Sequence, residues 1–237
     1  MAPLLDLFER IYVINLASRE DRRQEMQAQF QRIGLDLRMR GVELFEAVRP
    51  DDRGEFPSIG SRGCFLSHLG VLRRAAASGL QRILIVEDDL NFADDFVERL
   101  ALIAPELRSS PWSIFYGGYR LDEPEVPVGD GPLRRVPATT GVGTTHFVAV
   151  AGGAIEQLAA YLEAQLQRRS GDPLGGPMHV DGSYSWFRRA HPELLTLLAV
   201  PELGHQRASR TDIHDLRWHD RAWGLRSLVA LARKLRN

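Results

Sequence analysis

Cysteine, lysine and long apolar runs are scarce in this sequence of 237 residues. Cys64 is the lone cysteine, which excludes an intrachain disulfide and favours a reducing compartment. No apolar run approaches the roughly 20 residues that span a bilayer, and the first ten residues lack the basic start and apolar core of a secretory signal. We therefore expect a cytoplasmic protein that is soluble or bound peripherally at the inner face of the membrane.

The sequence also lacks an excess of charge of either sign. The formal net charge is -1, so no global charge points to nucleic acid as a partner. The basic residues are almost all arginine, with Lys234 as the single lysine, which we attribute to genome composition. The hydrophobic fraction of 44% is enough for one substantial core. With no internal repeat and no low-complexity tract, the composition favours a single α/β domain.

The most informative stretch is ILIVEDDLNF, at residues 83–92. Its four leading apolar residues predict a strand buried on both faces. Glu87, Asp88 and Asp89 follow directly. They cannot be buried without partners, because removing each charge from water would cost roughly several kcal/mol. We expect them at the carboxyl end of the strand, where ligands bind in open α/β sheets. The cluster predicts a site for a divalent metal and a nucleotide phosphate; the alternative is that Asp89 or Asn91 caps a helix and the other acids are solvated.

A strand followed by a helix opens the chain, as in many nucleotide-binding α/β units. Residues 10–16 (RIYVINL) predict a strand, and Ser18 is expected to cap a helix that ends at Gly34. Asn15 and Arg22 lie where a nucleotide would be held. Arg22 is the better candidate for a phosphate contact, because a guanidinium group matches planar oxyanions.

A second helix is predicted over residues 61–79, where Gly79 ends an apolar stripe. Ser67 and His68 are adjacent in it, which suggests a hydrolase at first sight. We reject that interpretation, because neighbours on a helix point about 100° apart and do not form a nucleophile–base pair. The histidine is expected to be a hydrogen-bonded packing residue.

The remaining segments complete an α/β pattern. Strands are expected at residues 35–40, 112–116, 144–150 and, as the last one, 194–200; helices are expected at 92–104 and 155–167. The irregular stretch 120–142 predicts a lid or binding loop. We divide the chain into one domain, residues 1–215, and a basic amphipathic helix, residues 216–237, which either docks on the domain or contacts an anionic membrane surface.

Three motifs together resemble glycosyltransferase family 25, which contains bacterial lipopolysaccharide-type galactosyltransferases and collagen galactosyltransferases. They are VINLASREDR at residues 13–22, GCFLSHLGVLRRA at 63–75 and ILIVEDDL at 83–90. Weaker matches follow in the same order at 143–162, 179–181 and 206–213. The chain departs from the family at Ser61 and Arg62, where an acid is usual, and at Gly152 and Gly153, where polar residues are usual.

The resemblance implies a Rossmann-like A-type glycosyltransferase fold, with a mixed, mostly parallel sheet flanked by helices. It also implies a UDP-sugar donor and Mn²⁺, with Mg²⁺ as an alternative. Asp89 would bind the metal with Glu87 or Asp88, and His205 would be a further ligand. Alternation along a strand favours Glu87 and leaves Asp88 to meet the ribose or sugar. The residues carried over as nucleotide-sugar contacts are Asn15, Leu16, Arg19, Arg22, Ser67, His68 and Asp88.

The implied reaction is an inverting transfer of a hexose, galactose or glucose, to an acceptor hydroxyl on a cell-surface glycan or lipooligosaccharide. Such a transfer needs a base, and Asp181 beside His179 matches the late aspartate of the family. The alternative for Asp181 is a helix cap or turn. Two other functions stay open: a non-catalytic sugar- or nucleotide-binding relative, and a metal-dependent phosphohydrolase.

Overall fold

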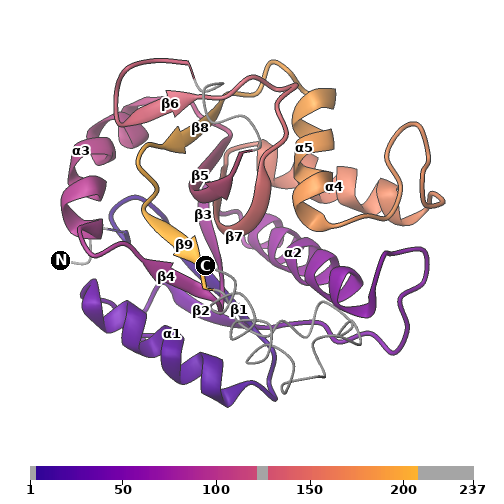
Figure 1. Cartoon of the computed structure of the whole chain (residues 1–237), viewed down its shortest axis with the longest axis horizontal. Helices are drawn as coiled ribbons and strands as arrows, with labels where there is room; N and C mark the ends of the chain where they lie inside the picture. Colours follow the sequence, from indigo (N-terminus) through magenta and orange to yellow (C-terminus); the bar gives the residue numbers. More distant parts are fainter. Residues whose placement is uncertain (1–3, 122–127, 208–237) are drawn as a thin grey trace, which may run out of the picture.

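A seven-stranded sheet runs through the part of the chain that the structure, a computed structural model, describes: residues 4–121 and 128–207 (Figure 1). Its order is β2-β1-β3-β7-β5-β8-β6. Only β7 and β6 run antiparallel to their neighbours, which confirms the mixed, mostly parallel sheet. The strands are β1 (Arg10–Asn15), β2 (Val42–Glu46), β3 (Arg82–Glu87), β5 (Ile114–Arg120), β6 (Leu133–Arg135), β7 (Gly143–Ala151) and β8 (Thr196–Ala199).

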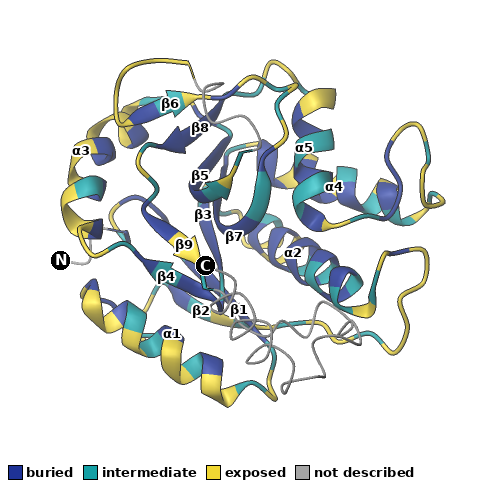
Figure 2. Ribbon diagram, in the orientation of Figure 1, coloured by how far each residue is buried: buried dark blue, intermediate teal, exposed yellow. Residues whose placement is uncertain are grey.

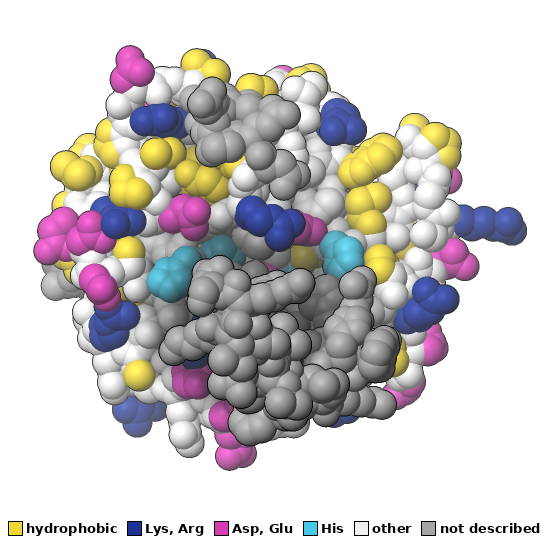
Figure 3. Space-filling view, viewed as in Figure 1, with side chains coloured by type: hydrophobic (Ala, Val, Ile, Leu, Met, Phe, Trp, Pro, Cys, Tyr) yellow, Lys and Arg dark blue, Asp and Glu magenta, His cyan; other side chains and the backbone are white. Residues whose placement is uncertain are grey.

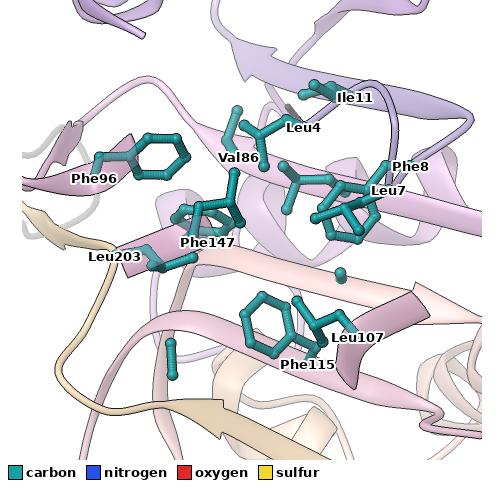
Figure 4. Close-up of a cluster of buried hydrophobic side chains, with 14 of the residues drawn as sticks. Leu4, Leu7, Phe8, Ile11, Val86, Phe96, Leu107, Phe115, Phe147 and Leu203 are labelled. Carbon is teal, nitrogen blue, oxygen red and sulfur yellow. The ribbon is translucent and has the colours of Figure 1, made fainter. Parts of the chain in front are cut away.

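Helices cover both faces of the sheet (Figure 1). On one face lie α1 (Glu20–Arg32) and α3 (Phe96–Ser109), whose apolar side chains share a core with alternate strand residues such as Leu84 and Val86. Figure 4 shows part of this cluster around Val86, Phe115 and Phe147. On the other face lie α2 (Ile59–Ala77), α4 (Ala154–Leu166) and α5 (Val180–Ala190), packed on the intervening strand residues.

The burial pattern follows directly from this layering. The central strands are dark blue in Figure 2, and the helices expose only their outer sides. In β3 the four residues Ile83–Val86 are fully buried, two toward each helical layer. Because side chains alternate along a strand, a continuous apolar run is what a sheet covered on both faces requires. The strand predicted from residues 83–86 is confirmed.

A short two-stranded sheet was not predicted from the sequence. It pairs β4 (Leu90–Phe92) with β9 (Gly204–Gln206), so the expectation that residues 194–200 form the last strand is wrong. The helix predicted at 92–104 instead begins at Phe96, because Phe92 belongs to β4, and it continues past Pro105 to Ser109. Two segments 112 residues apart in sequence are thereby joined beside the acids that follow β3.

Two local predictions near the N-terminus are also wrong. Residues 35–40 form a turn and not a strand, because the Asp36 side chain accepts hydrogen bonds from the Arg38 backbone and from Gln27. The second strand is β2, which begins at Val42. Ser18 is exposed and does not cap α1; Arg19 occupies that position without a capping hydrogen bond from its side chain.

No helix within residues 4–121 and 128–207 is both long enough and apolar enough to cross a membrane. The basic helix expected at 216–237 lies outside the described residues, as does most of the weak motif match at 206–213. Residues 122–127 of the expected irregular stretch also lie outside them, and the described remainder of that stretch contains β6.

The central strand should dominate stability. Leu84→Ala removes a fully buried side chain from β3, and we expect it to lower the free energy of unfolding by about 2–5 kcal/mol in urea denaturation. The matched control is Leu102→Ala on α3, where the side chain is 69% exposed and the change should stay within about 0.5 kcal/mol. Equal effects of the two substitutions would contradict the layering described above.

Candidate functional site

Three consecutive acids leave the sheet at the carboxyl end of β3 and turn in different directions. Alternation along the strand puts Glu87 on the side of α2, with Ile83 and Ile85, and Asp88 on the side of α1. Parallel pairing of β1 with β3 sets Ile14 opposite Glu87, so Asn15 lies beside Asp88. In Figure 3 histidine side chains lie around a central hollow of the molecule, next to arginine and acidic side chains.

Asp88 is held by two residues of the N-terminal motif. Asn15 Nδ2 donates to its Oδ2 at 2.8 Å, and Arg22 Nη1 donates to its Oδ1 at 2.8 Å. All three residues are buried, so a charge-assisted pair replaces the hydration of both ions. The structure thus brings together three of the predicted nucleotide contacts, and it places Arg22 against a carboxylate. Arg23, which was not among the predicted site residues, donates to Asn15 Oδ1 at 3.2 Å.

The other predicted contacts near β1 lie on the surface of the turn into α1. Arg19 forms an ion pair with exposed Asp21, and its backbone N–H donates to the carbonyl of half-buried Leu16. Hydrogen bonds from Arg19 lower the pKa of Asp21 to about 2. This pair holds the entry to the helix, in the first turn where acids complement the helix dipole.

Glu87 points into the opposite layer. Thr145 Oγ1 donates to Glu87 Oε1 at 2.7 Å, and His68 Nε2 lies 3.3 Å from the same oxygen. Burial would raise the pKa of Glu87, but the hydrogen bond and charge of His68, together with the Thr145 hydroxyl, hold that pKa below its usual value. The other ring nitrogen of His68 lies 3.1 Å from the Tyr184 hydroxyl. Glu87 is therefore an ionised acid with its own partners.

The buried pair Ser67 and His68 is occupied by protein contacts. Ser67 Oγ donates to the Gly63 carbonyl and accepts from the Val48 N–H, and its side chain is fully buried. His68 is equally buried, which agrees with the packing role expected for it. Neither side chain is presented to a ligand in this conformation. The helix that carries them instead supplies a wall behind Glu87.

Asp89 differs from its neighbours because one of its oxygens is left over. Its Oδ2 accepts from Gln206 Nε2 at 3.0 Å, while its Oδ1 is buried and has no hydrogen-bond partner within the described chain. Burial, together with the negative charge of Glu87, raises the pKa of Asp89 to about 7. A buried carboxylate oxygen without a donor is costly, and a hard divalent cation is the partner that such an oxygen favours. The residue fits a metal ligand.

The late segment reaches this acid through the small sheet. In β9, His205 pairs with Asn91 of β4, and its side chain is exposed. The next residue, Gln206, donates its side-chain hydrogen bond to Asp89. Arg207 then donates its backbone N–H to the Asp89 carbonyl at 2.7 Å. The β4–β9 pairing therefore brings His205 close to the acid cluster, but the residue that contacts Asp89 is its neighbour Gln206.

The predicted metal ligands Glu87, Asp89 and His205 do not form a compact set. Within the described residues, the group whose ligand atoms lie within 4.8 Å of one another is Cys64, His68 and Glu87. A thiol, an imidazole and one carboxylate suit zinc better than Mn²⁺, which prefers oxygen. Burial also raises the pKa of the Cys64 thiol well above its usual value, which disfavours the thiolate that a metal would need. Asp89 is the better candidate for a hard cation.

Asp181 lies in the first turn of α5. His179 occupies the N-cap position of this helix, so Asp181 is not its N-cap, which was one of the alternatives to a role as base. Its Oδ2 accepts from the Thr144 N–H at 3.0 Å, and its Oδ1 accepts from the Gly182 N–H at 2.7 Å. The carboxylate is half-buried and oriented by these two donors.

Thr145, His146 and Tyr184 belong to this site and were missed in the sequence. Thr145 and His146 lie near the amino end of β7, the strand that pairs antiparallel with β3. Their polar side chains at the start of an apolar strand were the available signal. Which strand lies next to β3, however, depends on the topology and cannot be seen in the spacing of residues.

Comparisons with known proteins point to the same family as the sequence motifs. Residues 8–119 match the model of "Glycosyltransferase family 25 (LPS biosynthesis protein)". The chain is 28% identical over 172 residues to a cattle (Bos taurus) protein called "Probable inactive glycosyltransferase 25 family member 3", covering 65% of this chain and 29% of the relative. It is 27% identical over 206 residues to "Procollagen galactosyltransferase 1-B" of Xenopus laevis, covering 78% and 32%. The chain thus spans about a third of the length of these relatives.

A solved structure supports the fold. It is the crystal structure of a glycosyltransferase involved in the glycosylation of the major capsid of PBCV-1. The similarity has a TM-score of 0.51 and covers 85% of this chain and 93% of that one, at 11% sequence identity. At this identity the likeness shows the fold alone, an α/β sheet flanked by helices.

The raised pKa of Asp89 predicts a pH dependence in metal-free protein. Folded Asp89 keeps its proton up to about pH 7, while an unfolded aspartate loses it near pH 4, so stability falls as pH rises through this window. The Asp89→Asn variant has no such titrating group and should not lose stability in this way. Relative to the wild type, we expect its free energy of unfolding to rise by about a few kcal/mol from pH 5 to pH 8, since each pKa unit corresponds to about 1.4 kcal/mol.

Urea denaturation with a chelator present measures the difference. Asp21→Asn is the matched control, because the pKa of Asp21 is lowered to about 2 and its contribution is constant over the same range. An Asp89→Asn variant whose stability parallels that of the wild type from pH 5 to pH 8 would contradict the raised pKa.

Proposed function

Because this chain belongs to glycosyltransferase family 25, we propose that it transfers a hexose, galactose or glucose, from a UDP-sugar to an acceptor hydroxyl with the help of a divalent cation. The acceptor is a cell-surface glycan or lipooligosaccharide, in keeping with the family's description. The observation that carries the proposal is Asp89 Oδ1, a buried carboxylate oxygen at the carboxyl end of a central strand for which residues 4–121 and 128–207 supply no hydrogen-bond donor.

Asp89 would hold the cation, with Glu87 or His205 completing its protein ligands. Mn²⁺ or Mg²⁺ at this place would neutralise charge on the leaving diphosphate. Asn15, Arg22 and Asp88 form the adjoining wall, where the nucleoside and its phosphates are received. Their mutual hydrogen bonds fix the wall before the donor arrives, which lowers the ordering cost of binding.

Asp181 is the proposed base. In an inverting transfer the acceptor hydroxyl gives its proton to a carboxylate as its oxygen bonds to the sugar carbon and the UDP leaves. Asp181 is an acid on the other helical layer, oriented by two backbone N–H groups, and each of its oxygens has a further lone pair for an acceptor. Its separation from the acid triplet allows a base and a metal ligand to have different environments.

Removing the base should stop transfer without loss of donor binding. We expect Asp181→Asn to lower kcat by about 10²–10⁴-fold, the usual contribution of a positioned base, with the Kd for the UDP-sugar changed less than about twofold. Transfer assays and calorimetric donor titration measure the two quantities. The control is Asp130→Asn at an exposed aspartate, which should leave both unchanged. Normal turnover of Asp181→Asn would remove this residue from the mechanism.

Removing the metal ligand should have the opposite signature. Asp89→Asn should abolish the Mn²⁺-dependent part of UDP-sugar binding, because a neutral amide lacks the charge that holds the cation. Thermal shift with UDP-galactose and UDP-glucose, each with and without Mn²⁺, reports the loss, since a bound ligand raises the melting temperature. Parallel Glu87→Gln and Asp88→Asn variants identify the second acid on the metal. Unaltered Mn²⁺ dependence in Asp89→Asn would exclude Asp89 as a ligand.

A non-catalytic relative is the second candidate, because the cattle relative is called inactive. Ser61 and Arg62, which stand where the family usually has an acid, are the sequence differences relevant to this alternative. Both have structural partners here: Ser61 completes the capping box of α2 with Ser58, and Arg62 pairs with Asp52. Slow Mn²⁺-dependent hydrolysis of the donor distinguishes a transferase from a binding module, which would show none. Release of phosphate from simple phosphate esters would instead indicate a phosphohydrolase.

A further inference from the structure

Thr144, at the start of β7, has a left-handed backbone. Its φ is +68°, and among the described residues it is the one non-glycine residue with positive φ. This conformation brings Cβ close to the backbone and is unfavourable for a β-branched residue. Such strain persists only where the surroundings hold it in place, and it gathers at functional sites. The contacts that hold Thr144 are therefore informative.

One face of α5 holds the segment that leads into Thr144. Asp181, Ser185 and Arg188 are spaced i, i+4 and i+7, so they lie on the same side of the helix. Asp181 accepts from the Thr144 N–H, and Ser185 Oγ both accepts from the Val142 N–H at 3.1 Å and donates to the Val142 carbonyl at 3.3 Å. The helix that carries the proposed base thus grips the chain on both sides of Gly143.

Arg188 makes this grip firm. Its side chain is only 1% exposed and donates to the carbonyls of Thr140 at 2.9 Å and Pro137 at 2.7 Å, and to Thr196 Oγ1 at 3.0 Å. No ion pair to Arg188 occurs among the residues described, so neutral oxygens alone satisfy the buried guanidinium. Removing any of these acceptors would leave a buried charge short of partners, which strongly favours a single arrangement of the segment.

The Thr144 side chain reaches a second buried group. Its Oγ1 lies 3.0 Å from His146 Nδ1, and His146 is 2% exposed. The Nε2 of His146 lies against Gly118, where an added Cβ would be 2.3 Å from it and 2.5 Å from the Gly204 carbonyl oxygen. Burial lowers the pKa of His146 below its usual value, against the opposing effects of the nearby Glu87 charge and of a hydrogen bond with the Gly204 backbone.

We propose that Thr144 is a positioning residue for the transfer: its strained backbone aims an N–H at Asp181, and its hydroxyl fixes the ring of His146 beside the acid cluster. Thr145, between them, donates to Glu87. Three consecutive residues therefore connect the base to the acids and hold the distance between them. This inference rests on the proposed function, because Asp181 must be the base for its position to matter.

Three substitutions separate the two parts of this role. Thr144→Val keeps the β-branched shape and removes the hydroxyl alone. Thr144→Gly removes the hydroxyl as well and in addition relieves the backbone strain and frees the direction of the N–H, so its difference from the valine variant reports the backbone part. Thr144→Ser keeps the hydroxyl. We expect kcat to fall about tenfold or more in the glycine and valine variants, with donor Kd changed less than about twofold. The serine variant should keep most of its turnover. The melting temperature of Thr144→Gly should equal or exceed that of the wild type.

The matched control is Thr139→Val, at an exposed threonine of the same segment. A purely structural Thr144 would give a different pattern: kcat, donor Kd and melting temperature would decline together, and that result overturns the inference. Wild-type turnover in both the glycine and valine variants overturns it as well.

Nitrogen NMR of the His146 ring provides a readout that does not need activity. We expect the Nδ1 and Nε2 shifts to change in Thr144→Val and to stay near wild type in Thr144→Ser. Unchanged shifts in Thr144→Val overturn the contact with His146. A wild-type protein that transfers no hexose while these shifts respond as expected would overturn the proposed function, and with it the catalytic purpose of Thr144, but not the contact itself.

Discussion

The repulsion among three consecutive carboxylates at the end of β3 is the constraint on which the site depends. Each acid receives its own surroundings: Arg22 and Asn15 for Asp88, His68 and Thr145 for Glu87, and Gln206 for one oxygen of Asp89. These partners come from β1, α1, α2, β7 and β9, so much of the fold takes part in separating the three charges. What is left over is one buried oxygen of Asp89, which a cation would complete.

The sheet topology explains why these partners meet. Parallel β1 and β3 deliver Asn15 and the acids to the same edge, and antiparallel β7 between β3 and β5 brings its amino end, with Thr144 to His146, to that edge as well. Asp181 joins them because α5 packs over the start of β7. The proposed base and Glu87 are thus held by consecutive residues of β7, Thr144 and Thr145.

Much of the layering could be predicted from the sequence, because the apolar run before Glu87 needs a sheet covered on both faces. That these acids need partners at the end of the strand followed from the cost of burying an unpaired charge. Three features could not be predicted. The ion pair between Arg22 and Asp88 depends on the register of β1 against β3. The β4–β9 pair joins two segments whose short apolar patterns are not distinctive. The left-handed backbone of Thr144 is imposed by its contact with α5, against the preference of its own side chain.

The central claim is that Asp89 Oδ1 is the place of the cation. Anomalous diffraction from crystals grown with Mn²⁺ and UDP tests it most directly, because the peak locates the metal independently of any assay. We predict one peak in coordination contact with Asp89 Oδ1. A peak enclosed by Cys64, His68 and Glu87, or an ordered UDP with no metal at Asp89, would contradict the claim.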